Sequence, residues 1–266
     1  MNGVALWYEV KGSGPYLVQI GGAVSAHEGY STVTDAMSEH FTVIDYDHRG
    51  YGRSDRPAQR YTMETWADDL AGLLDAIGVQ RAHVHGGSMG GFVATLFAAR
   101  FPERVDRLVI SGAVARCDRM AKHQLEVWKL VARAYGADSI ELVLELSTKA
   151  FSRAFLDSIS PELLRETREV VARNVTTDVF CDACDAMIDT DVTAELTKIT
   201  APTLLLCGEE DCLTPLRCGP DGVGMEKMAE LIPDACLHVF PNCGHGNLIE
   251  RVDESIRVIV EHLLGN

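Results

Sequence analysis

The segment Gly86-Gly87-Ser88-Met89-Gly90 has the residue types of a turn that presents a nucleophile. It follows the apolar run 82–85, which has the length of a buried strand, and it precedes the apolar helical segment 92–101. Glycines on both sides permit a turn so sharp that Ser88 adopts a strained backbone and stands clear of the sheet edge. The Met89 N–H, at the start of the helix, then points to where an oxyanion would form. The pattern therefore predicts Ser88 as a nucleophile and Met89 as an oxyanion donor.

A serine is a poor nucleophile unless a base takes its proton and a carboxylate orients that base. Two later loops supply these groups, each directly after a predicted strand. Acidic residues 209–211 follow the strand 203–207, and His245 follows the strand 236–240. Because parallel strands end at one edge of a sheet, we expect these loops to meet the Ser88 turn there. His245 is the predicted base, while the residues alone leave Glu209, Glu210 and Asp211 open as its orienter.

The elements that must hold these loops alternate between strand-like and helix-like segments. Strands are expected over 4–10, 16–20, 41–44, 82–85, 105–110, 203–207 and 236–240, and helices over 32–40, 65–77, 92–101, 225–231 and 248–264. Uniformly apolar strands separated by helices predict an α/β fold, with a mostly parallel central sheet and helices on both of its faces.

Residues 116–191 interrupt this alternation with helical segments alone, near 122–135, 138–155, 161–174 and 177–189. The pair Ser160-Pro161 is a good helix start, because serine caps helices well and proline suits the first helical position. An all-helical insertion between two halves of a sheet predicts a cap. We therefore expect a first core part over 1–115, a helical cap over 116–191 and a second core part over 192–266.

Taken together, these features resemble the α/β-hydrolase fold superfamily over nearly the whole chain. Residues 47–55, Asp-His-Arg-Gly-Tyr-Gly-Arg-Ser-Asp, resemble that family's D-x-R-G-x-G-x-S loop. The likeness is closest to 3-oxoadipate enol-lactonases and small esterases, and looser to carbon–carbon hydrolases that act on meta-cleavage products. The resemblance implies Ser88 as the nucleophile, His245 as the base and Asp211 as its orienter.

The predicted oxyanion hole departs from the family pattern at one position. Family members usually carry His-Gly before the second donor, whereas this chain has Gly21-Gly22, which makes Ala23 the donor beside Met89. Backbone donors do not depend on side chains, so the hole is expected to survive with a more loosely held loop. The nearby His48 and His85 are expected to hold structure rather than to do chemistry.

The predicted cap is rich in large apolar side chains, and a lid on this fold buries one face over the nucleophile. The set comprises Trp128, Leu130, Phe151, Phe155, Phe180 and Met187. We therefore expect a small, largely apolar carboxylic ester or lactone as the substrate. The residues predicted to contact it are Gly22, His27 and Trp128.

Composition narrows the range of partners. A formal net charge of −15 disfavours nucleic acid and anionic membranes, which would repel the protein. The N-terminus lacks the pattern of a signal peptide, and no apolar run approaches the ~18 residues of a membrane span, so a cytoplasmic protein is expected. Among the eight cysteines only Cys181 and Cys184 form a close pair, and no second pair matches them. We expect free thiols, no metal and no cofactor, and homo-oligomerisation is left open.

The serine at position 88 also selects among reactions. Epoxide hydrolases and haloalkane dehalogenases of the resembled family use an aspartate there, whereas serine permits cleavage of esters, lactones, thioesters and some carbon–carbon bonds. A carbon–carbon hydrolase of the meta-cleavage-product type is therefore the first alternative. A small-molecule receptor on the same fold is the second, and the presence of all three triad residues favours an enzyme. Turnover of a p-nitrophenyl ester would separate the two.

Overall fold

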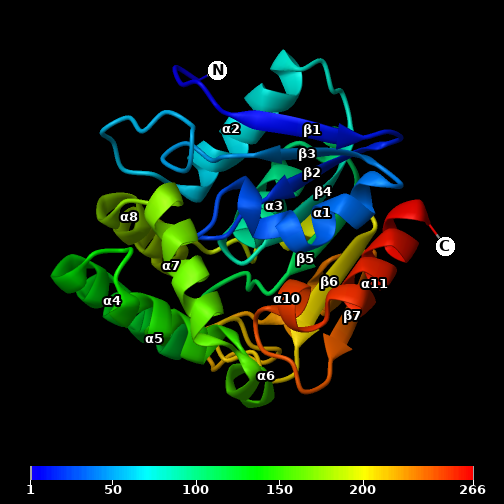
Figure 1. Cartoon of the computed structure of the whole chain (residues 1–266). Coiled ribbons are helices and arrows are strands. Elements are labelled where there is room, and N and C mark those ends of the chain that lie inside the picture. Colours follow the sequence, from blue (N-terminus) through cyan, green and yellow to red (C-terminus); the bar gives the residue numbers. More distant parts are fainter. Residues whose placement is uncertain (1, 266) are drawn as a thin grey trace.

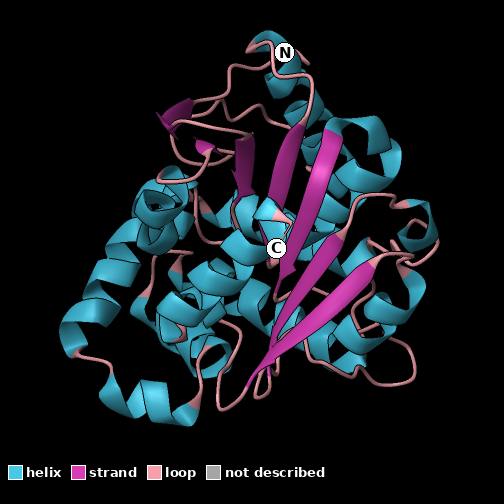
Figure 2. Cartoon of the chain, turned by 90° about the vertical axis from the view of Figure 1, so that its right-hand side faces the viewer, coloured by secondary structure: helices cyan, strands magenta, loops and turns pink. Residues whose placement is uncertain are grey.

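The computed structural model describes residues 2–265, and a seven-stranded sheet runs through them (Figures 1 and 2). The strand order is β1 (Tyr8–Gly12), β3 (Thr42–Tyr46), β2 (Tyr16–Ile20), β4 (Ala82–Gly87), β5 (Val105–Ser111), β6 (Thr203–Gly208) and β7 (Ala235–Phe240). The edge strand β1 is antiparallel to β3, and each other neighbouring pair is parallel. The predicted fold class is confirmed.

Helices cover both faces of the sheet because alternate strand residues feed two separate cores. On one face lie α1 (Ser31–Ser38), α10 (Asn247–Glu250) and α11 (Val252–Leu264), and on the other lie α2 (Met63–Ala76), α3 (Met89–Arg100) and α9 (Met225–Leu231). In β6, Leu204 and Leu206 belong to the apolar core on the face covered by α1 and α11. Leu205 and Cys207 belong to the core on the face covered by α2 and α3. Every residue of α3 from 89 to 98 is buried. No helix within residues 2–265 combines the length and apolar character of a membrane span.

Five helices stand between β5 and β6 and form a layer at one side of the sheet (Figure 1). They are α4 (Arg119–Tyr135), α5 (Ile140–Ala150), α6 (Arg153–Ser158), α7 (Pro161–Asn174) and α8 (Thr177–Asp189). Each begins after a side chain that accepts from a backbone N–H of its first turn, namely Asp118, Ser139, Ser152, Ser160 and Thr176. Arg116 and Asp191, which flank this helical segment in the sequence, form an isolated antiparallel β-bridge. The division of the chain into three parts stays a prediction.

Three elements differ from the sequence-based expectation. The helix expected over 138–155 is broken into α5 and α6, because Ser152 caps a new helix and is held by the distant Glu250. The strand expected over 4–10 begins only at Tyr8, because the N–H groups of Ala5 and Trp7 donate to side chains of the 47–55 loop. The helix expected over 248–264 is divided at Arg251, whose φ of −132° and ψ of 48° are not helical.

Gly90 supports a stability prediction, because a Cβ there would lie 2.0 Å from Ile20 O and 2.7 Å from Gly21 O. Relief of that clash requires β2 to move, so Gly90→Ala should lower the free energy of unfolding by about 3 kcal/mol. The matched control is Gly219→Ala, whose Cβ would meet its nearest neighbour, Asp118 Oδ2, at 3.4 Å. This control should stay within about 0.5 kcal/mol of wild type. Denaturant unfolding monitored by circular dichroism measures both, and equal stabilities would contradict the prediction.

Candidate active site

Ser88 occupies the turn between β4 and α3 with a φ of 54° and a ψ of −121°. Such a conformation costs a non-glycine residue on the order of 1–3 kcal/mol, and close packing enforces it here. A Cβ at Gly86 would lie 2.2 Å from Gly90 O, and one at Gly90 would meet Ile20 O. The Ser88 N–H donates to Ser111 O at 2.9 Å, which ties the turn to β5. Both glycines are therefore sterically required for the turn that presents Ser88.

Asp211 and His245 meet at the same edge of the sheet, from the loops after β6 and β7. Asp211 Oδ2 lies 2.9 Å from His245 Nδ1. Asp211 Oδ1 accepts from the N–H groups of Leu213 and Thr214 at 2.8 and 2.9 Å, and the Thr214 hydroxyl donates to Oδ2 at 2.7 Å. Thr214 was missed in the sequence, where a threonine three residues after an acid carries no distinctive signal. The carboxylate is thus fully engaged and fixes the orientation of the imidazole.

This pair shifts both pKa values in the directions that suit an acid–base couple. Burial alone would raise the pKa of Asp211, but the charge and hydrogen bond of His245 and the donors of Thr214 outweigh it, so the pKa is lowered. Burial alone would lower the pKa of His245, but the Asp211 anion and its hydrogen bond outweigh that effect and raise it. Asp211 therefore stays ionised at neutral pH, and His245 binds a proton more tightly than a free imidazole.

The two predicted oxyanion donors lie on either side of Ser88. Met89 is the first residue of α3, so its N–H belongs to the helical turn whose donors have no intrahelical acceptor. Ala23 lies in the loop after β2, and within residues 2–265 its N–H donates to no protein acceptor. A Cβ at Gly22 would lie 3.3 Å from Ser88 Cβ, so this loop passes directly beside the nucleophile. Both segments lie next to Ser88, and the role of Ala23 and Met89 as oxyanion donors stays a prediction.

The loop after β2, with Gly21, Gly22 and Ala23, carries the predicted oxyanion donor and is called the oxyanion loop below. It lacks the histidine that is usual in the family, and two side chains of the 47–55 loop hold it instead. His48 Nε2 lies 3.2 Å from Gly21 O, and burial lowers the pKa of His48 to about 4, so the neutral ring donates this hydrogen bond. The Tyr51 hydroxyl donates to Ala23 O at 3.2 Å and lies 3.8 Å from Met89 Sδ. His48 thus holds backbone, as expected. The loop is fastened from a different element than the family's histidine, and the expectation of a more loosely held loop stays a prediction.

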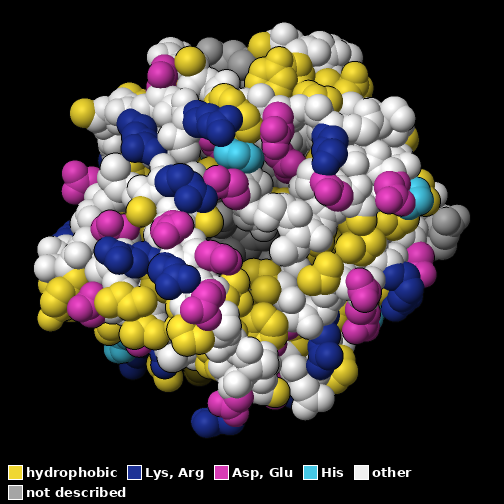
Figure 3. Space-filling model, viewed as in Figure 1, with side chains coloured by type: hydrophobic (Ala, Val, Ile, Leu, Met, Phe, Trp, Pro, Cys, Tyr) yellow, Lys and Arg dark blue, Asp and Glu magenta, His cyan; other side chains and the backbone are white. Residues whose placement is uncertain are grey.

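Ser88 and His245 line two cavities, and they share this lining with Ala23, Trp128 and Leu213. A hollow beside α7 is visible near the middle of the surface drawn in Figure 3, which has the view of Figure 1. Four of the predicted apolar cap residues contribute to the cavities, namely Trp128, Phe151, Phe180 and Met187. Phe155 packs on Phe151 with ring centroids 5.0 Å apart, whereas Leu130 is 64% exposed.

His27 is placed outside both cavities. Its backbone N–H and its Nδ1 lie 2.9 and 2.7 Å from Asp47 Oδ1, and its ring centroid lies 4.2 Å from that of Trp7. It lines a separate hollow together with Glu9 and Asp45. The other two predicted substrate contacts, Gly22 and Trp128, both line the larger of the cavities at Ser88. The predicted contact of His27 with substrate gains no support from this arrangement and stays a prediction.

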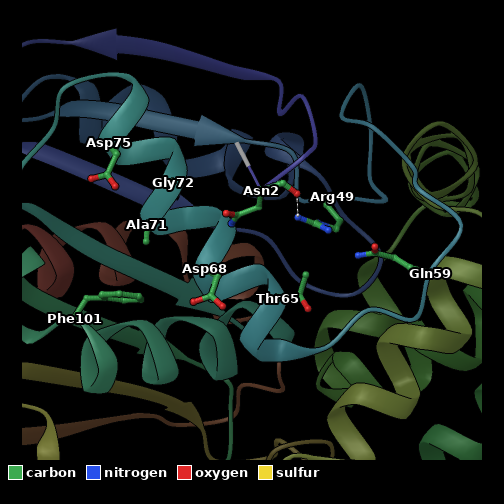
Figure 4. A pocket seen from close by; sticks show the side chains of 9 residues that line it. All are labelled: Asn2, Arg49, Gln59, Thr65, Asp68, Ala71, Gly72, Asp75 and Phe101. Atoms are coloured by element: carbon green, nitrogen blue, oxygen red, sulfur yellow. Dashed lines mark hydrogen bonds between the residues drawn. The ribbon is translucent and has the colours of Figure 1, made fainter.

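A wider hollow of about 510 Å³ lies along α2 and is lined largely by polar side chains (Figure 4). Its charged groups already have partners. Arg49 forms two hydrogen bonds of 2.6 Å with Asp69, and Asp68 and Asp75 pair with Arg100 and Arg104 at 2.7 and 2.9 Å. Among the described residues, no serine, cysteine or histidine lines this hollow. The two cavities at Ser88, rather than this hollow, therefore form the candidate site.

The loop that carries His245 is joined directly to the layer formed by helices α4–α8. Glu250 Oε1 accepts from the Gly244 N–H at 2.9 Å and from the Ser152 N–H at 3.1 Å. The Ser152 hydroxyl donates to the other oxygen of the same carboxylate. In addition, the Gly246 N–H donates to Ala150 O at 3.0 Å. The break between α5 and α6 therefore lies where the layer of helices α4–α8 contacts the His245 loop.

All eight cysteines are free thiols, and both Cys181 and Cys184 are buried in α8. Within residues 2–265 no group of three His, Cys, Asp or Glu side chains is arranged to hold a metal ion. The expected independence of metal and cofactor stays a prediction.

Comparison with known proteins places this site in a family. The model of the alpha/beta hydrolase fold matches residues 17–252, and the chain belongs to that family. A 2-hydroxy-6-oxo-2,4-heptadienoate hydrolase of Pseudomonas putida is 30% identical over 263 residues, which cover 96% of this chain and 87% of that protein. Fold and relatives together define the protein as a hydrolase.

Solved structures give the same result. The enol-lactonase from Burkholderia xenovorans LB400 superposes with a TM-score of 0.87 and 26% identity, covering 99% of this chain and 98% of that one. A thermophilic esterase from Thermogutta terrifontis superposes with a TM-score of 0.85 and 28% identity, covering 98% and 94%. The resemblance predicted from sequence is confirmed.

The raised pKa of His245 leads to a prediction for the pH dependence of the rate. His245 accepts a proton only when it is neutral, so kcat/KM falls as the pH drops through its pKa, and this limb should lie above the ordinary value of 6.5. Asp211→Asn removes the anion but keeps the burial, so the limb should move to lower pH. The rate should also fall by about 10³- to 10⁴-fold, because the amide favours the wrong imidazole tautomer. Steady-state rates between pH 5 and 9 test both effects, and an unmoved limb would show that a different group titrates.

Tyr51 yields a prediction about the oxyanion loop. Tyr51→Phe removes the hydroxyl that binds Ala23 O while keeping the ring, so the loop donor shifts and kcat should fall about tenfold, less than for deletion of a donor. Tyr61→Phe is the matched control, because its hydroxyl donates to Pro57 O at 2.7 Å, away from the loop. The control should keep the wild-type kcat, measured with a p-nitrophenyl ester beside the melting temperature. Equal kcat values for both variants would remove Tyr51 from this role.

Proposed function

We propose that the protein is a serine hydrolase that cleaves a small, largely apolar carboxylic ester or lactone through an acyl-enzyme. One observation carries the proposal: a buried, fully hydrogen-bonded Asp211 orients His245 in the same cavity wall as the strained Ser88. A nucleophile, a base and an orienter in this relation are what acyl transfer by serine requires.

In the proposed reaction the Ser88 Oγ forms a bond to the substrate carbonyl carbon while His245 Nε2 takes the serine proton. The carbonyl oxygen gains the negative charge and accepts hydrogen bonds from the N–H groups of Ala23 and Met89. The carbon–oxygen bond to the leaving alkoxide then breaks, and His245 returns the proton to that alkoxide. Water repeats the sequence on the acyl-enzyme, which releases the carboxylic acid and restores Ser88. With a lactone, the released hydroxyl stays attached to the acyl group.

Carbon–carbon cleavage is the second candidate, because a relative at 30% identity is named for a dienoate substrate. A dienoate carries a carboxylate, and a buried carboxylate needs a cation or several donors nearby. Among the described residues, the side chains that line the two cavities are neutral apart from His245. That lining favours an uncharged ester or lactone over a dienoate. The second alternative, a small-molecule receptor, would need no serine, histidine and aspartate arranged for acyl transfer, so it is not favoured.

Substitution of the triad tests the proposal. Ser88→Ala and His245→Ala should each reduce the turnover of p-nitrophenyl acetate by 10⁴-fold or more, because triad members act as a unit. Ser158→Ala, a serine on the exposed side of α6, is the control and should leave the rate unchanged. Mass spectrometry of the intact protein should show an added acyl group in wild type but not in Ser88→Ala. Wild-type protein that binds esters without turnover would instead support a receptor, and cleavage of a dienoate alone would support the carbon–carbon hydrolase.

A further inference from the structure

The edge strand β1 has a strand neighbour on one side only among residues 2–265. It stands first in the strand order of the sheet, and all five of its residues are exposed (Figure 1). The opposite edge strand, β7, is better covered, because only Cys236 of its six residues is exposed. An open strand edge offers N–H and C=O groups to which a further strand can bind. Of the two edges, β1 is therefore the more accessible to another strand.

Successive residues of β1 direct their backbone groups alternately toward β3 and toward the open side. The Asp47 N–H donates to Trp7 O at 3.0 Å, and these two residues continue the antiparallel register of β1 and β3. Directly opposite residues of an antiparallel pair exchange hydrogen bonds only at every second position. Counted from Trp7, the backbone groups at positions 9 and 11 point to β3. Those that point to the open side belong to Tyr8, Val10 and Gly12.

The sequence of β1 complements itself when a second copy is added antiparallel across this edge. With Val10 opposite Val10 of the second copy, the outward-facing backbone groups meet in register and Glu9 comes opposite Lys11 twice. Opposite side chains in such a pair lie ~5 Å apart, so unlike charges attract there and like charges repel. At the two ends Tyr8 comes opposite Gly12, which has no side chain to obstruct the ring. Backbone pairing and side-chain charge thus select the same register.

The two faces of β1 differ in character. Tyr8 and Val10 lie on one face and are 43% and 51% exposed, so a second strand would remove apolar surface from water there. Glu9 and Lys11 lie on the other face, where Lys11 also pairs with Asp35 of α1. A second copy would place its own Glu9 beside this lysine. Each face therefore contributes to association, one through burial and the other through charge.

We propose that two copies of the protein associate by antiparallel pairing of β1 with β1 about a two-fold axis at Val10, which joins their two sheets into one. Five residues of each copy form the pairing, fewer than the roughly 20–30 residues a side of a standard interface. The dimer therefore dissociates on dilution. No residue of β1 lines either cavity at Ser88, so the proposal does not depend on the serine-hydrolase function.

Charge reversal tests the register. In analytical ultracentrifugation, wild type should change from monomer to dimer between about 1 and 500 µM. Glu9→Lys and Lys11→Glu each place like charges opposite one another at both positions, so each should weaken the dimer at least about fivefold. The double variant Glu9→Lys/Lys11→Glu brings unlike charges opposite again, and so does an equal mixture of the two single variants. Both should recover the dimer, and failure of both to do so would overturn the proposal.

Two further variants distinguish pairing at this edge from association elsewhere. Val10→Pro removes the central outward N–H but leaves the hydrogen bonds to β3, so it should abolish the dimer. Leu130→Lys is the matched control, because it removes an exposed apolar side chain from α4 and should leave the dimer unchanged. Melting temperatures verify that each variant is folded. A wild type that stays monomeric, a dimer that survives Val10→Pro or a dimer lost with Leu130→Lys would each contradict the proposal.

Amide hydrogen exchange in wild type tests the same pairing without any substitution. NMR spectra recorded at about 30 and 500 µM should show the Val10 amide becoming at least about tenfold more protected at the higher concentration. The Lys11 amide, which points to β3, should be protected equally at both. If the Val10 amide is unaffected by concentration, or if both amides change alike, the pairing of β1 with β1 is wrong.

Discussion

Burial of the Asp211 carboxylate is the constraint on which the catalytic end of the molecule depends. A carboxylate that is 4% exposed would cost several kcal/mol if its oxygens lacked donors. Its donors come from its own loop and from His245 on the next one, so β6 and β7 must be parallel neighbours in the observed register. Gly208 permits the close approach, because a Cβ there would lie 1.9 Å from Gly244 O. The position of His245 is therefore decided by strand pairing more than by either loop alone.

The sequence predicted the elements whose cause is local and missed those whose cause is distant. Apolar strands followed by glycine turns and polar loops were sufficient to predict the sheet and to bring Ser88, His245 and the acidic residues 209–211 to one edge, whereas the choice of Asp211 among the three acids came from the family resemblance. The break between α5 and α6 was missed because Ser152 depends on Glu250, which lies 98 residues further along the chain. The indole N–H of Trp128, which has no hydrogen-bond partner among the described residues, carries no sequence signal, since only side-chain packing decides which donors remain unpaired.

In this family, similarity of fold does not imply that two proteins catalyse the same reaction. The sheet and cap superpose on an enol-lactonase and an esterase over nearly the whole chain. The side chains that line the two cavities at Ser88, however, come largely from helices and loops. In this chain they are neutral apart from His245. The likeness in fold therefore does not decide the charge of a substrate.

The carboxylate of Glu250, which accepts hydrogen bonds from both Gly244 and Ser152, limits which helical segments could replace residues 116–191. A cap that touched the core only through apolar packing could be inherited or exchanged as a separate module. Here Gly244 and Ser152 donate to one oxygen of Glu250, so the His245 loop and the layer of helices α4–α8 share a single acceptor. A cap taken from another lineage must supply an equivalent donor, or it leaves that carboxylate short of a partner beside the base. The position of the His245 loop and that of helix α6 thus depend on one side chain.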